Sequence, residues 1–295
     1  MTDTLEYQHK GPKLFPMYAK AAIIPKGSAS GKSRKDIQIP ELTAKLTGVQ
    51  TNLEALRAYR KLCGFETSTQ MPATWPQLEA FSLHIRLMTD PKFPLPLLGM
   101  VHLRNVITQH RPIHEGECLD ITCTTGGSKR TDKGLEFEML TNIESGGRLV
   151  WEGVSTMLFR MPSEGGSKPK KVPEPPKPLT HEQGIHAAAD TGRRSGKVSG
   201  DINPIHMNSL SARLFGFPKA IAHGMWSKAQ CLSAMQRRPD FRNGAFRIEA
   251  NFKKPLFLPG TASLSWDEDG KEWPFKLLNA KATAPHLDGR IQFLD

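Results

Sequence analysis

The hydrophobic pattern along this 295-residue chain alternates between strand-like and helix-like segments. The β-branched and aromatic content typical of strands is found in four segments: Leu119–Thr125, Leu149–Phe159, Phe246–Phe252 and Thr261–Trp266. Segment Gly224–Arg237 instead predicts a helix, because its apolar residues recur on one helical face, namely Met225, Ala229, Leu232 and Met235. A long helix followed by antiparallel strands indicates an α+β architecture in which a sheet wraps around a central helix.

The same order of elements is repeated in the two halves of the chain. Each half has a helix-like run that opens with Gly-Met, then a turn with proline and glycine, then two strands. The matching segments are Leu97–Met100 with Ala222–Met225, His110–Thr124 with Phe252–Trp266, and Phe137–Asn142 with Phe275–Asn279. Three matches in one order predict that the chain is a duplication of a single unit.

A change of composition separates the two copies. Residues 163–180 contain five prolines together with glycines and several lysines, and almost no large apolar side chains. This composition predicts an extended, semi-rigid linker. We therefore expect an N-terminal unit at 1–162 and a C-terminal unit at 181–295, which is consistent with a length that suits two domains.

Charge narrows the choice of partner. Forty Lys and Arg against 29 Asp and Glu give a formal charge of +11, on a chain that is 38% hydrophobic and 23% charged. This composition is typical of a soluble globular protein with a polyanionic partner, such as a phosphorylated cofactor or an acidic carrier protein. Nucleic acid is not expected as a partner, because the basic residues form no single stripe and no nucleic-acid motif is present.

The N-terminus and the cysteines indicate a reduced, cytoplasmic protein that does not enter a membrane. No secretory signal is found in the first ten residues, and the apolar stretch Leu14–Pro25 is interrupted by Lys20 and falls short of the ~20 residues of a membrane span. The four cysteines form no CxxC pair. Cys118 and Cys123 should lie on opposite faces of one strand, which argues against a disulfide between them.

Candidate chemistry is concentrated between Ser199 and Met225. Asp201, Asn203 and His206 lie within six residues, around a proline that prevents a regular helix there. A short helix with a polar start follows, and then His223-Gly224 opens the longer helix. The segment predicts an acid–base site beside a helix N-terminus, whose free N–H groups can stabilise developing negative charge.

Each of these residues also has a structural interpretation. Asp201 followed by Asn-Pro, taken alone, is more typical of an Asx turn that caps the next helix, and a single histidine such as His206 is more often structural. The combination with the downstream His-Gly-Met favours a site. His223 is expected to be structural, and the apolar stripe of the long helix to be core. No metal is expected, because the carboxylate and the imidazole lack a third ligand at a familiar spacing.

The segment Ser199–His206, SGDINPIH, resembles the MaoC-like (R)-specific enoyl-CoA hydratases, together with the residues that follow it: Ala212, Gly216-Phe217 and His223-Gly224-Met225. The match is strong over the C-terminal third, and the N-terminal half resembles the family only through the duplication. The resemblance implies a double hotdog fold, with two antiparallel sheets each wrapped around a central helix. It also implies reversible hydration of trans-2-enoyl thioesters to (R)-3-hydroxyacyl thioesters, without a cofactor.

The resemblance also implies a role for individual residues. Asp201 and His206 match the catalytic pair, Asn203 matches a supporting polar residue, and Gly224 matches the residue whose N–H binds the thioester carbonyl. We add their neighbours Ser199 and Met225 as expected substrate-binding residues. The chain departs from the family at Ser195, where an aromatic residue is common.

The N-terminal half is expected to be non-catalytic, because Tyr59–Met71 contains no equivalent of the Asp/Asn/His set. The expected substrate is a thioester of coenzyme A or of an acyl carrier protein, and basic residues could contact its phosphates: Arg193, Arg194, Lys253 and Lys254. The sequence does not determine whether the protein is a homodimer, how long the acyl chain is or in which direction the reaction runs. It also assigns no structure or role to the first forty residues. Two other functions also stay open, an acyl-CoA thioesterase and a non-catalytic acyl-thioester-binding subunit.

Overall fold

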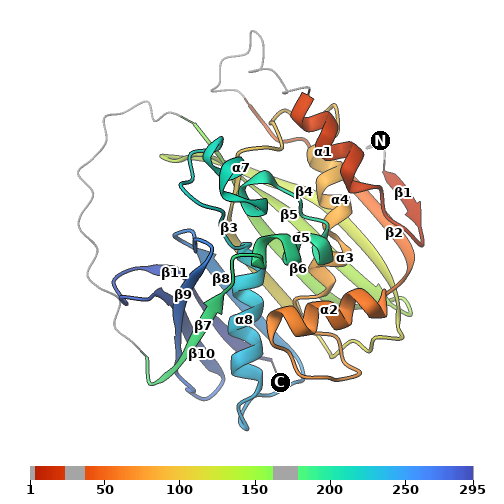
Figure 1. Ribbon diagram of the computed structural model, residues 1–295. Coiled ribbons are helices and arrows are strands. Elements are labelled where there is room, and N and C mark those ends of the chain that lie inside the picture. Colours follow the sequence, from red (N-terminus) through yellow and green to blue (C-terminus); the bar gives the residue numbers. More distant parts are fainter. Residues whose placement is uncertain (1–3, 24–36, 162–178, 295) are drawn as a thin grey trace.

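The computed structural model describes residues 4–23, 37–161 and 179–294. Its strands form one eleven-stranded sheet, in the order β1-β2-β4-β5-β6-β3-β8-β11-β10-β9-β7 (Figure 1). The strand bounds in the N-terminal half are β1 Leu5–Gln8, β2 Thr43–Gln50, β3 Met100–Gln109, β4 Cys118–Thr131, β5 Gly134–Ser145 and β6 Arg148–Arg160. Those in the C-terminal half are β7 His181–Ala187, β8 Phe246–Phe252, β9 Gly260–Trp266, β10 Glu272–Asn279 and β11 Pro285–Phe293.

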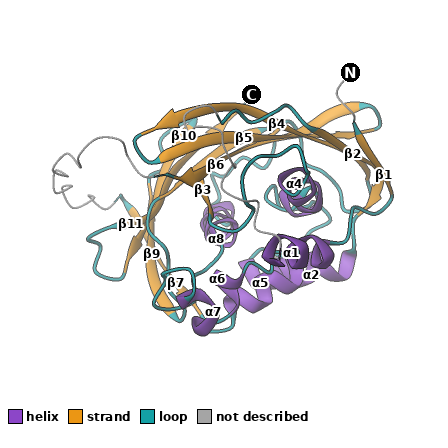
Figure 2. Cartoon of the chain, turned by 90° about the horizontal axis from the view of Figure 1, so that it is seen from above, coloured by secondary structure: helices purple, strands orange, loops and turns teal. Residues whose placement is uncertain are grey.

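The helices lie on one side of this curved sheet. They are α1 Leu14–Ile23, α2 Leu53–Cys63, α3 Pro76–Glu79, α4 Phe81–Met88, α5 Thr191–Ser199, α6 Pro204–Met207, α7 Ser209–Arg213 and α8 Gly224–Gln236. Figure 2 shows α4 and α8 enclosed by the sheet, with α1, α2, α5, α6 and α7 farther from it. The C-terminal end of α2 is fastened to α8, where Trp226, Gln230 and Ser233 donate hydrogen bonds to the carbonyls of Leu62 and Cys63. The last carbonyl groups of a helix receive no hydrogen bond from within it, and these bonds from α8 supply the missing donors.

The strand order shows the duplication directly. Strands β2-β4-β5-β6-β3 of one half are followed across the sheet by β8-β11-β10-β9-β7, which is the same arrangement in reverse. The halves meet where β3 pairs antiparallel with β8, with Arg104 opposite Asn251 and Gln109 opposite Phe246. The two expected sheets are therefore joined into one, and each half wraps around its own helix. Among the strands of the described residues, β1 and β2 form the one parallel pair.

Two of the three predicted repeat matches occupy equivalent positions. The second pair lies at the connections β3–β4 and β8–β9, and the third pair lies in β5 and β10. The first match is wrong, because Met100 begins a strand whereas Gly224 begins a helix. The central helix of the N-terminal half is α4, and the segment after it contains Pro91, Pro94 and Pro96, which cannot continue a helix.

The predicted elements of the C-terminal half agree closely with the structure. Strand β8 has the predicted bounds, and α8 ends one residue before the predicted Arg237. Ala229, Leu232 and Met235 are fully buried, as expected for core. The sequence predicted one buried face for α8, but the helix is enclosed on most sides. Trp226 and Lys228 are buried as well.

Other sequence expectations have mixed outcomes. Cys118 is exposed and Cys123 buried, as their strand positions predict, and all four cysteines are free. The predicted linker lies outside the described residues except for 179–180, so the division at 163–180 stays a prediction.

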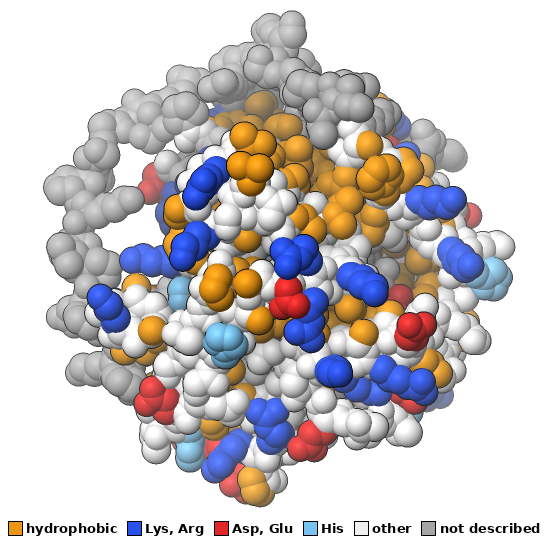
Figure 3. Space-filling model, in the orientation of Figure 1, with side chains coloured by type: hydrophobic (Ala, Val, Ile, Leu, Met, Phe, Trp, Pro, Cys, Tyr) orange, Lys and Arg blue, Asp and Glu red, His pale blue; other side chains and the backbone are white. Residues whose placement is uncertain are grey.

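In the described part of the chain, no helix has the length and apolar character needed to cross a membrane. Lys and Arg side chains are dispersed over the face in Figure 3 and interspersed with acidic ones.

One buried charge ties the two halves together. Lys228 on α8 is completely buried, and its Nζ donates to the side-chain oxygen of Asn105 at 2.6 Å, to the Asn105 carbonyl at 3.1 Å and to the Ile248 carbonyl at 3.1 Å. Asn105 belongs to β3 and Ile248 to β8, so the amino group bridges the two strands at the junction. Burial lowers the pKa of Lys228 well below its ordinary value, whereas the three acceptors, which match the three N–H groups of an ammonium, favour the charged form.

We expect Lys228→Met to lower the free energy of unfolding by about 3 kcal/mol, because three buried oxygens lose their donor and this outweighs the relief of a buried charge. Chemical denaturation of the wild type and the variant measures the difference. Lys197→Met is the matched control, since Lys197 is exposed on α5 and its replacement should change stability by less than about 0.5 kcal/mol. A variant as stable as the wild type would show that the bridge does not hold the halves together.

Candidate active site

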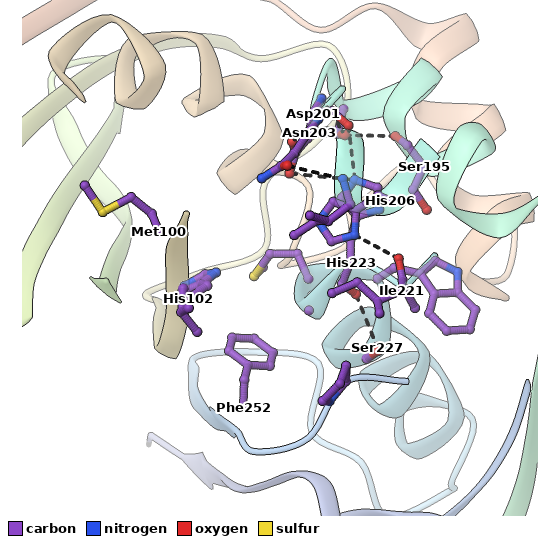
Figure 4. A pocket seen from close by; sticks show the side chains of 18 of the residues that line it. Met100, His102, Ser195, Asp201, Asn203, His206, Ile221, His223, Ser227 and Phe252 are labelled. Carbon is purple, nitrogen blue, oxygen red and sulfur yellow. Dashed lines mark hydrogen bonds and ion pairs between the residues drawn. The ribbon is translucent and has the colours of Figure 1, made fainter. Parts of the chain in front are cut away.

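A cavity of about 440 Å³ lies between the two halves, and both contribute to its walls. Figure 4 shows Asp201, Asn203, His206 and His223 gathered on one wall, with His102 and Phe252 across from them. The first wall comes from the turn after α5 and from the start of α8, whereas His102 comes from β3. Every predicted site residue lines this cavity: Ser199, Asp201, Asn203, His206, Gly224 and Met225.

The turn that carries the acid–base residues is fixed by its own side chains. Helix α5 ends at Ser199 and is capped by Gly200, which has the left-handed φ of 74° that glycine tolerates. Ser199 Oγ accepts from the Asp201 N–H at 3.1 Å and donates to the Ser195 carbonyl at 2.8 Å. Asp201 Oδ1 accepts from the Asn203 N–H at 3.1 Å, and Asn203 Oδ1 caps α6 by accepting from the Ile205 N–H at 3.4 Å. The Asx-turn interpretation is thus correct, and it describes the same turn that presents the polar groups to the cavity.

His206 is held as a neutral imidazole with one free nitrogen. Its Nδ1 lies 2.8 Å from the Ile221 carbonyl, which can only accept, so Nδ1 carries the proton and Nε2 keeps its lone pair. Burial, and then the neighbouring His223, lower the pKa of His206 to about 3, and the charge of Asp201 opposes this effect. A neutral imidazole with an available Nε2 is the form that a general base requires.

His223 belongs to the same cluster, although the sequence indicated only a structural role. Its ring stacks on His206 with centroids 3.7 Å apart and 26° between the planes. Its Nε2 donates to the Asp201 carbonyl at 3.1 Å and lies 3.7 Å from Asp201 Oδ2. His223 therefore positions the backbone of Asp201 and faces its carboxylate at the same time.

Asp201 is kept ionised by the groups around it. Burial raises the pKa of Asp201, but His223, His206, the Asn203 N–H and the Tyr18 hydroxyl together outweigh burial, so that the pKa lies below its ordinary value. The carboxylate is therefore an acceptor only, beside the free nitrogen of His206.

The N-terminus of α8 adds hydrogen-bond donors to the same wall. Its first residue is Gly224, and the preceding His223 side chain makes no capping hydrogen bond. The first N–H groups of a helix have no acceptor within it, and the dipole places positive charge there. Gly224 is also sterically required, since a Cβ at this position would lie 2.9 Å from Phe252 Cε1.

The cluster has the spacing of a possible metal site. Asp201, His206 and His223 each offer a ligand atom, and these atoms lie within 4.8 Å of one another. The sequence shows no third ligand at a familiar spacing, and folding supplies one in His223. Two of the four ring nitrogens are, however, committed to carbonyl acceptors, which suits a hydrogen-bonded acid–base cluster.

The opposite wall contains groups that the sequence did not indicate. His102 stacks at an angle on Phe252, with ring centroids 4.9 Å apart, and burial followed by the charge of Lys228 lowers its pKa to about 3. No local motif surrounds His102, so only the fold could reveal it. Among the basic residues expected near substrate, Lys253 and Lys254 line the cavity with Arg160, whereas Arg193 and Arg194 are exposed on α5 outside its lining.

Comparison with known proteins finds one family model and several relatives that are similar to this chain. The model of the MaoC-like domain family matches residues 170–288. The chain is 31% identical over 259 residues to 3-hydroxyacyl-thioester dehydratase X of Mycobacterium tuberculosis, covering 87% of this chain and 91% of that protein. It resembles the crystal structure of HtdX from M. tuberculosis with a TM-score of 0.75 and 31% identity, over 85% of this chain and 99% of the other.

The expected double hotdog fold is confirmed by a further comparison. A conserved protein of M. tuberculosis with a double hotdog fold matches with a TM-score of 0.52 at 11% identity, over 89% of this chain and 98% of that chain. At this level of identity the likeness shows the fold alone.

The state of His206 can be tested without a substrate. We expect its imidazole to stay neutral, with the proton on Nδ1, from pH 8 down to about pH 5, because burial and His223 disfavour the cation. Long-range ¹H–¹⁵N correlation spectra report the tautomer directly, and His206→Gln assigns the signal. A titration midpoint near the reference value of about 6.5 would contradict the assignment.

Proposed function

The chain belongs to the family of MaoC-like dehydratases, and from this premise we propose that it catalyses reversible addition of water to a trans-2-enoyl thioester. The product is an (R)-3-hydroxyacyl thioester, and the reverse reaction is its dehydration. The observation that supports this most is the pairing of a free imidazole nitrogen on His206 with an ionised Asp201, on the wall where α8 begins. Water and protons are the only co-reactants, so no cofactor is required.

In the proposed hydration, His206 Nε2 removes one proton from a water that Asp201 orients. The water oxygen bonds to C3, the C2=C3 electron pair moves toward the thioester, and negative charge develops on the carbonyl oxygen. The Gly224 N–H and the positive end of α8 stabilise this charge. His206 then returns its proton to C2, and the carbonyl re-forms. The reverse sequence eliminates water.

The lowered pKa of His206 favours the second half of this cycle, in which the proton is returned, and makes the imidazole a weaker base in the first half. It keeps the imidazole unprotonated in the free enzyme, and it makes the transient imidazolium a strong acid toward C2. Asp201 lies close enough to stabilise that imidazolium by charge. His206 therefore acts as base and then as acid, while Asp201 orients water and balances charge.

The substrate is proposed to enter from the basic side of the cavity. Lys254 and Arg160 line it there with Lys253, which pairs with Asp288 at 3.3 Å. Cationic side chains at that place suit the phosphates of coenzyme A or of a carrier-protein arm. The acyl chain would then extend along the apolar side chains that the N-terminal half contributes, such as Met139 and Met157.

We expect the purified protein to hydrate crotonyl-CoA or a longer trans-2-enoyl-CoA, measured as loss of the enoyl-thioester absorbance. Asp201→Asn and His206→Ala should each lower kcat by about 10²–10⁴-fold, since each removes one part of the acid–base pair. Chiral analysis of the product tests the (R) configuration.

Other outcomes of this assay favour other functions. Release of free thiol would support a thioesterase, and binding without turnover would support a non-catalytic subunit. Hydration that survives both substitutions would contradict the assigned mechanism.

The role of Gly224 has its own test. Gly224→Ala introduces a methyl group 2.9 Å from Phe252 Cε1, so the ring or the start of α8 must move. We expect kcat to fall at least about tenfold, because one poorly placed donor at a developing oxyanion is costly. Gly244→Ala is the matched control, since a Cβ there meets no atom within 4 Å and should leave kcat unchanged. Equal rates in the two variants would contradict the expectation that glycine is required at position 224.

A further inference from the structure

The carboxylate of Asp201 has a partner from the opposite end of the chain. The Tyr18 hydroxyl on α1 donates to Asp201 Oδ1 at 2.9 Å, across 183 positions of sequence. Tyr18 is only 8% exposed, whereas Phe15 on the same helix is 74% exposed. Helix α1 therefore turns its Tyr18 side toward the acid–base turn.

A second contact shows that α1 is fitted to this turn. Leu14 lies one helical turn before Tyr18, and its Cδ1 occupies the space that a Cβ at Gly200 would need. Gly200 directly precedes Asp201. The apolar contact at Gly200 and the hydrogen bond at Asp201 therefore place α1 against two consecutive residues of the turn.

The two oxygens of Asp201 have different surroundings as a result. Oδ1 accepts from both the Tyr18 hydroxyl and the Asn203 N–H. Oδ2 lies 3.7 Å from His223 Nε2, which is beyond hydrogen-bond range, so it keeps its capacity to accept. Burial and the charge of Asp201 raise the pKa of Tyr18 above its ordinary range, so the phenol remains a donor at every working pH.

We propose that Tyr18 is a positioning residue of the reaction, whose hydroxyl holds Oδ1 of Asp201 so that Oδ2 is presented to the reacting water. The proposal rests on the proposed hydratase function and extends it to the N-terminal helix. Tyr18 itself is absent from the cavity lining and acts through Asp201. The active site then combines three distant parts of the chain: α1, the turn after α5, and the start of α8.

The decisive variant is Tyr18→Phe, which removes the hydroxyl and keeps the ring. We expect kcat for enoyl-thioester hydration to fall about tenfold, with KM changed less than about twofold, because the substrate contacts stay in place. We also expect the acid limb of the pH–rate profile to move upward by about one pH unit, since the ionised carboxylate loses a donor. The other titratable groups facing Asp201 are His206, His223 and, by charge interaction, His102, and they are unchanged in this variant.

Two further variants separate positioning from packing. Tyr7→Phe makes the same chemical change on β1 in the same N-terminal segment and should leave kcat and the pH profile at wild-type values. The double variant Tyr18→Phe with Asp201→Asn should be no slower than Asp201→Asn alone, because Tyr18 acts only through that carboxylate. Thermal melts confirm that each variant is folded.

The possible outcomes are distinct. Wild-type kcat and pH limb in Tyr18→Phe would overturn the proposal, as would a loss of rate that simply adds to that of Asp201→Asn. If the wild type hydrates no thioester, the proposed function fails, and ¹³C NMR titration of the Asp201 carboxyl then tests the Tyr18 contact alone. An unchanged carboxyl pKa in Tyr18→Phe would show that the contact does not support the carboxylate.

Discussion

The pairing of β3 with β8 is the constraint on which the rest of the molecule depends. β3 lies at one edge of the N-terminal half of the sheet, and β8 lies at one edge of the C-terminal half. If these strands did not pair, each would expose an unpaired edge, and such edges are prone to aggregation. Joining the two edges satisfies both strands and makes one continuous sheet. It also brings α4 and α8 under the same curved surface, which creates the shared cavity (Figure 2).

Lys228 reinforces that junction and also acts on one side chain of the cavity, His102. Its ammonium donates to both strands. The Asn105 amide nitrogen in turn donates to Gln77 Oε1 at 3.3 Å and to Ser155 Oγ at 3.1 Å, which extends the hydrogen-bond network. The same charge helps to keep His102 neutral. One wall of the cavity therefore carries the neutral His102, and the other carries the ionised Asp201.

The sequence was most informative where the structure is local. The turn from Ser199 to His206 is made by hydrogen bonds between residues two to four positions apart, so its residue types reveal its shape. Strand β8 and helix α8 were predicted within a residue because their apolar patterns are long and bounded. The Gly-Met match led to a wrong prediction, because a shared dipeptide does not indicate whether a helix or a strand follows it.

What sequence could not supply is contact across the chain. Tyr18 meets Asp201 over 183 positions, and His102 faces the site only because β3 pairs with β8. His223 follows Asp201 by 22 residues, and neither its hydrogen bond to the Asp201 carbonyl nor its stacking on His206 has a local signature. These are tertiary consequences of the junction and of α1, and no periodicity or spacing indicates them.

An acid–base pair in a cavity must satisfy two opposing requirements. Removing a carboxylate from water raises its pKa, yet the proposed reaction needs Asp201 charged beside a neutral base. The groups around Asp201 meet both requirements: His223 and His206 favour its charge, and Asp201 Oδ1 accepts from the Tyr18 hydroxyl and the Asn203 N–H. His206 stays neutral because burial and the neighbouring His223, on which its ring stacks, lower its pKa by more than Asp201 and the hydrogen bond to the Ile221 carbonyl raise it. The site therefore depends on groups that never meet the substrate, which is why its chemistry is tied to the assembly of both halves and of the N-terminal helix.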